Sequence, residues 1–157
     1  MSRSAVLVVC VSLAAVLALS ACGSDAKKTK TVTPQQAAIL TFYLKASNVC
    51  AETNKITDPL KPKRLSDIGK AAGTLAPAGS AQIVALRTLT PPANLRDGWL
   101  RMLQLLQGQV DLLRDVQTAQ AQHKPKAQVL TIVKALNDST IQGEQLAQAL
   151  RRPTCGT

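Results

Sequence analysis

The residue types that could support catalysis or metal binding are few in this chain and lie far apart. The single histidine, His123, stands in a charged turn without a second ligand nearby, which favours a solvated loop histidine over a metal ligand. Asp111 and Asp115 are one helical turn apart, as paired acid–base carboxylates could be, but the neighbouring Arg114 favours an exposed, solvated face. The sequence contains neither a Gly-rich phosphate loop nor a Gly-x-Ser-x-Gly nucleophile motif. We therefore expect a protein that is not an enzyme and that holds no metal or cofactor.

The first residues have the pattern of a secretory signal peptide. Arg3 gives a short positively charged start, residues 5–19 are apolar apart from one serine, and two small residues then precede Cys22. A membrane-spanning helix needs about 20 apolar residues, so this run is short for a permanent span. We expect residues 1–21 to be removed; a short membrane anchor is the alternative interpretation.

The segment Leu19-Ser20-Ala21-Cys22 resembles the bacterial lipobox, in which an aliphatic residue and two small residues precede an invariant cysteine. The resemblance implies that Cys22 receives a diacylglyceryl thioether, with acyl chains such as palmitate, and becomes the mature N-terminus. The protein would then be secreted and lipid-anchored to the outer face of the cell membrane. Two or more acyl chains hold a protein stably at a membrane, whereas a single chain binds only marginally.

Positive charge follows the expected anchor and continues along the chain. Lys27, Lys28 and Lys30 lie in a short tether, residues 22–33, where each could add about 1 kcal/mol of attraction to an anionic membrane or simply keep the tether solvated. The whole chain carries a formal net charge of +10. Such a balance favours an anionic lipid, an envelope polymer or an acidic envelope protein as partner, although it also serves solubility. Nucleic acid is not expected, because aromatic residues for base stacking make up only 2% of the chain.

Two cysteines, Cys50 and Cys155, are left after signal-peptide removal and lipidation. An oxidising compartment favours a disulfide between them, with two free thiols as the alternative. Closing a loop of about 100 residues would stabilise the fold by about 4.7 kcal/mol in the chain-entropy model.

The rest of the chain, residues 34–157, has the length of one domain and shows only helical hydrophobic spacing. Thr33 is expected to cap the first helix, with Pro34 in its first turn. Pro77 and the residues up to Ser80 are expected to kink or break the second. The predicted helices span residues 34–54, 63–89, 94–122 and 125–152. The fold class is therefore an all-α, antiparallel bundle of about four helices.

Each predicted helix has a row of residues expected to face inward. The row of the first predicted helix is Leu40, Tyr43, Ser47 and Cys50, and that of the second is Leu65, Ile68, Ala72, Leu75, Ile83, Leu86 and Leu89. The row of the third is Leu95, Trp99, Met102, Leu106, Val110, Leu113, Gln117 and Gln120. The row of the fourth is Val129, Val133, Leu136, Thr140, Gly143, Ala147 and Leu150.

A Cys50–Cys155 bond does not fit a regular up–down bundle, because the two cysteines would lie at opposite ends of it. Either the first helix begins outside the bundle and is displaced along it, or the break near Pro77 reverses the chain. The sequence leaves both topologies open.

The segment from Leu86 to Ala93, followed by a long amphipathic helix, combines with an early Cys50 and a terminal Cys155. Together these features resemble small helical lipoproteins of high-GC Gram-positive bacteria. The resemblance assigns no site residues.

Two functions fit these expectations. The first is a non-enzymatic interaction module that presents a basic surface to a membrane, polymer or protein partner. The second is a carrier of a small molecule or lipid in a pocket between the helices. A dry pocket of several hundred Å³ would favour the carrier, whereas a filled core with a one-sided basic surface would favour the module.

Overall fold

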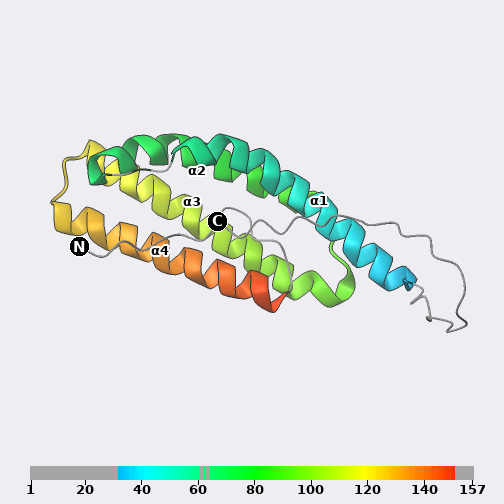
Figure 1. The fold of residues 1–157 in the computed structure, drawn as a ribbon. Coiled ribbons are helices and arrows are strands. Elements are labelled where there is room, and N and C mark those ends of the chain that lie inside the picture. The colour runs from blue at the N-terminus through cyan, green and yellow to red at the C-terminus, as the bar shows by residue number, and fades with distance from the viewer. Residues whose placement is uncertain (1–31, 61, 63, 151–157) are drawn as a thin grey trace, which may run out of the picture. The chain divides into compact units, whose positions relative to one another are not determined.

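Four long α-helices make up most of what the computed structural model describes, which is residues 32–60, 62 and 64–150. The elements are α1 (Pro34–Thr57), η1 (Asp58–Leu60), α2 (Leu65–Arg87), η2 (Ala93–Leu95), α3 (Arg96–Ala121) and α4 (Lys126–Ala149). The described residues contain no strand, and consecutive long helices run antiparallel (Figure 1). The predicted all-α antiparallel bundle is confirmed. Residues 1–31, which include the expected signal peptide and nearly all of the tether, lie outside the described residues.

The start of α1 is fixed by local hydrogen bonds. The Thr33 hydroxyl accepts a hydrogen bond from the Gln36 backbone N–H at 3.2 Å, and the Gln36 side-chain oxygen accepts one from the Thr33 backbone N–H at 2.9 Å. This reciprocal capping box satisfies two N–H groups that the first turn of a helix leaves without partners. The predicted cap at Thr33, with Pro34 in the first turn, is confirmed.

Of the two outcomes predicted at Pro77, a kink or a break, the break does not occur: α2 runs without interruption through that residue. A proline inside a helix costs about 3 kcal/mol, since it removes one backbone hydrogen bond and its ring crowds the carbonyl of residue i−4. Ala76 and Ile83, each 2% exposed, pack with Val110 of α3, and this burial on both sides of Pro77 offsets the local cost of the proline. The Ser80 hydroxyl also donates to the Ala76 carbonyl at 2.9 Å. The chain therefore does not reverse near Pro77, and the second topology is excluded.

The main core joins α1 to the end of α2 and the start of α3. Phe42 meets Trp99 edge to face, with ring centroids 4.9 Å apart, and Leu86 is fully buried beside them. On α1 the buried row is therefore Phe42, Ala46 and Cys50. The expectation that Leu40 faces inward is wrong: Leu40 is 54% exposed, because it lies on the side of α1 opposite to Phe42.

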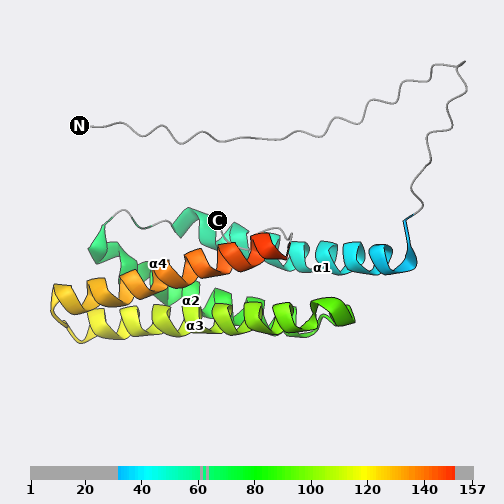
Figure 2. The same ribbon diagram turned by 90° about the horizontal axis from the view of Figure 1, so that it is seen from below.

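The helix α1 is displaced along the bundle. Figure 2 shows its N-terminal turns extending beyond the ends of α2 and α3. Its middle meets the end of α4, where the Tyr43 hydroxyl donates to the Leu150 carbonyl at 2.9 Å. Val32, at the projecting end of α1, is 56% exposed. Of the two topologies that the sequence left open, the displaced first helix is the one observed.

The helix α3 packs between α2 and α4 and is buried on more than one side. On α4 only Val129 and Ala147 are fully buried. Among the described residues, none of the helices has the length and hydrophobicity that a membrane span requires.

Truncating the aromatic side chain that holds α1 should destabilise the domain strongly. Phe42→Ala is expected to lower the free energy of unfolding by about 3–5 kcal/mol, because Phe42 is 4% exposed and its removal leaves a cavity. The control is Leu44→Ala on the same helix, which should change stability by less than about 0.5 kcal/mol. Urea denaturation followed by circular dichroism measures both. Similar losses in the two variants would contradict this packing of α1.

Candidate functional site

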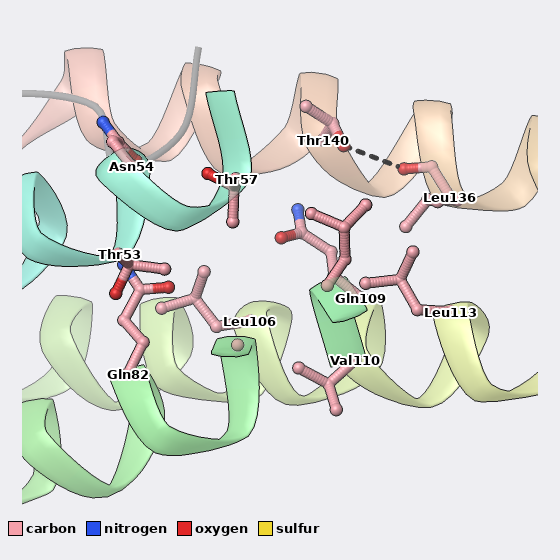
Figure 3. Close-up of a pocket in the computed structure, with 12 residues that line it drawn as sticks. Thr53, Asn54, Thr57, Gln82, Leu106, Gln109, Val110, Leu113, Leu136 and Thr140 are labelled. Carbon is pink, nitrogen blue, oxygen red and sulfur yellow. Dashed lines mark hydrogen bonds between the residues drawn. The ribbon is translucent and has the colours of Figure 1, made fainter. Parts of the chain in front are cut away.

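A cavity of about 240 Å³ lies where all four long helices meet, and we refer to it as the central pocket (Figure 3). Its lining residues are Thr53, Asn54 and Thr57 of α1; Leu75, Gly79 and Gln82 of α2; Leu106, Gln109, Val110 and Leu113 of α3; and Leu136 and Thr140 of α4.

The central pocket follows from the displacement of α1. Because α1 ends at Thr57, its last turns lie beside the middle of the other helices. On the other side of the pocket α2 and α3 approach each other closely, since a Cβ atom on Gly79 would lie only 2.8 Å from a methyl carbon of Val110. The α2–α3 pair thus forms one side of the pocket, while the C-terminal turns of α1 and the middle of α4 form the other side.

The polar side chains of the central pocket are all uncharged hydroxyls and amides. The Thr53 hydroxyl donates to the Val49 carbonyl at 3.2 Å, and the Thr140 hydroxyl donates to the Leu136 carbonyl at 3.0 Å. Each hydroxyl oxygen keeps lone pairs that can accept a further hydrogen bond. The remaining lining is aliphatic, so the pocket combines acceptors with an apolar surface.

Gln82 is the most deeply buried polar residue of the pocket. Its side chain is 8% exposed, and the described residues give its amide no hydrogen-bond partner. In Figure 3 it points from α2 toward Thr53, while Gln109 of α3 reaches toward the space between Thr57 and Thr140. Burying an amide without a partner costs about 1–3 kcal/mol. Gln82 thus carries an amide donor and acceptor that a bound molecule could satisfy.

Basic side chains gather at one end of the bundle, formed by the start of α2 and the turn between α3 and α4. The residues of this basic end line two shallow hollows, one with Arg64 and Lys70 and the other with His123, Lys124 and Lys126.

The two parts of the basic end are joined by a hydrogen bond from the Gln120 side chain to the Leu65 carbonyl at 2.7 Å. Asp67 is the one acidic residue that lines either hollow, and it pairs with Arg64 at 3.1 Å. Both α2 and α4 also begin here, and helix N-termini carry partial positive charge. The electrostatic potential of this end is therefore positive.

The candidate catalytic side chains of the sequence lie on the surface. His123 is exposed and has a φ of 51°, a left-handed conformation that ends α3. Asp111 pairs with Arg114 at 3.0 Å, and both side chains are about half exposed. The described residues contain no cluster of three or more His, Cys, Asp or Glu side chains that could hold a metal ion.

Cys50 lies on the buried face of α1 and is 6% exposed. Its expected partner Cys155 lies outside the described residues. So do the expected lipidation site and the membrane-proximal lysines, namely Cys22, Lys27, Lys28 and Lys30.

Of the polar residues that line the central pocket, the sequence analysis placed only Thr140 in an inward row, and it missed Gln82 and Gln109. Gln82 lies seven residues after Leu75 and four before Leu86, and Gln109 lies between Leu106 and Leu113. A glutamine in an otherwise apolar helical row is the signal that could have marked both positions. No family model, curated protein or solved structure matches the chain significantly.

Proposed function

We propose that this protein is a lipid-anchored component of the cell envelope whose helical domain binds an acidic partner without catalysing a reaction. The observation that carries the proposal is the basic end, where four Lys and Arg side chains and two helix N-termini meet with only Asp67 among them. Positive charge that is concentrated on one surface attracts a polyanion more strongly than the same charge dispersed over the molecule.

The position of the basic end favours an envelope polymer over the lipid surface itself. The preceding chain, with the proposed lipid on Cys22, joins the domain at Val32, at the projecting end of α1. The basic end lies at the opposite end of the bundle, beside the α3–α4 turn (Figure 2). The 23 residues of α2 alone extend over about 35 Å. Within the domain, the basic end is therefore remote from the point at which the preceding chain joins it.

We also propose that Cys50 and Cys155 form a disulfide. Tyr43, which is hydrogen-bonded to the Leu150 carbonyl, precedes Cys50 by two helical turns, or about 10 Å. The five residues from Leu150 to Cys155 can extend over about 17 Å. The end of the chain can therefore reach Cys50, and in an oxidising compartment the bond would persist. It would join α1 to the C-terminal tail.

Neutralising the basic end should weaken the binding of polyanions. For Lys124→Gln/Lys126→Gln we expect roughly tenfold weaker binding of poly(glycerol phosphate), or about 1.4 kcal/mol. Binding by the wild type should also fall as salt is raised to physiological strength, where the Debye length is about 8 Å. Isothermal titration calorimetry on the mature, non-lipidated chain measures both effects.

The matched control for this experiment is Lys45→Gln/Lys134→Gln, which removes the same charge from α1 and α4. It should bind the polymer nearly as well as the wild type. If the control loses as much affinity as Lys124→Gln/Lys126→Gln, net charge alone is responsible and the basic end is not the binding surface.

Replacing the proposed lipidation site should release the protein from the membrane. In Cys22→Ser the thioether cannot form, so labelled fatty acid should not be incorporated and the protein should leave the membrane fraction. Fractionation and metabolic labelling in the native host measure these outcomes. A membrane-bound Cys22→Ser variant, together with an unlabelled wild type, would show that the anchor is not a lipid on this cysteine.

A further inference from the structure

We propose that the central pocket binds a small uncharged molecule that carries a hydrocarbon part and an amide or hydroxyl group. This site is separate from the basic end, and the proposal does not depend on polyanion binding. It rests on the charge, the polar groups and the size of the cavity.

The lining of the pocket favours an uncharged ligand. None of its twelve residues carries an ionisable side chain. A charged group that enters such a site loses its hydration and finds no opposite charge, which is costly. A neutral ligand does not meet this penalty.

The deepest polar group of the pocket calls for a ligand that both donates and accepts hydrogen bonds. Gln82 is 8% exposed as a whole residue, and its amide has no hydrogen-bond partner among the described residues. Its N–H₂ group needs an acceptor and its oxygen needs a donor. A carboxamide or an alcohol supplies both. The Gln109 amide and the Thr53 hydroxyl offer further hydrogen bonds to the same group (Figure 3).

The other side of the pocket is suited to hydrocarbon. Five aliphatic side chains from three helices line it: Leu75, Leu106, Val110, Leu113 and Leu136. An apolar group that leaves water for this surface gains the hydrophobic free energy of the area it buries.

The volume of the cavity sets the size of the ligand. At about 240 Å³ it lies just below the usual range for small-molecule pockets, about 300–1,000 Å³. A whole two-chain lipid does not fit, so the structure favours a compact molecule with a short chain or a single ring.

The test uses matched probes that differ in charge but not in chain length. Hexanamide and hexanol are the neutral probes, and hexanoate and hexylamine are the charged ones. Ligand-observed NMR on the mature, non-lipidated chain should show saturable binding of the neutral probes and at least fivefold weaker binding of the charged ones. No saturable binding of either neutral probe, or equal binding of all four, would overturn the proposal.

Substitutions in the lining locate the binding. Gln82→Leu should weaken hexanamide binding at least fivefold while leaving the melting temperature unchanged or higher, because it removes a buried amide without a partner. Gln142→Leu, an exposed glutamine on α4, is the matched control and should bind like the wild type. Leu136→Phe provides a second variant, which should abolish binding by filling the apolar side. Unchanged hexanamide affinity in Gln82→Leu or in Leu136→Phe would show that the probe binds elsewhere.

Discussion

The packing of Phe42 against Leu86 and Trp99 fixes where α1 lies along the bundle, and the rest of the structure depends on that position. Phe42 lies toward the middle of α1, more than two turns after its start, while Leu86 is near the end of α2. From Phe42 to the end of α1 at Thr57 is about 22 Å, whereas from Leu86 back to the start of α2 is about 31 Å. The helix α1 therefore ends before it reaches the start of α2, and its first turns project beyond the opposite end.

This displacement explains two features that a regular four-helix bundle would not show. The last turns of α1 end beside the middle of the other helices, where they line the central pocket with Thr53, Asn54 and Thr57. The middle of α1 meets the end of α4, where Tyr43 is hydrogen-bonded to the Leu150 carbonyl. The packing of Phe42 thus determines the position of the candidate ligand site. It also determines where α1 contacts the end of α4, at the residue that precedes the C-terminal tail.

The sequence could predict the elements because their signals are local. The cap at Thr33 and the inward row of α4 depend on residues within a few turns of one another. The continuity of α2 through Pro77 could not be read in this way, because the packing of Ala76 and Ile83 on α3 offsets the local cost of the proline. The exposure of Leu40 and the burial of Gln82 likewise depend on the position of α1, which no periodicity encodes. The expected disulfide nevertheless led to two alternative topologies, and one of them, a first helix displaced along the bundle, is the topology observed.

The central claim is that α1 is displaced so that Cys50 lies within reach of the tail that follows α4. A disulfide tests it most directly, because the bond requires Cα atoms about 5.5 Å apart. Peptide mapping by mass spectrometry under non-reducing conditions, on the full chain purified from its own envelope, measures the pairing. We predict a single cross-linked peptide pair that joins Cys50 to Cys155 and disappears on reduction. Two free thiols in that material, or Cys155 joined to another molecule, would contradict the account.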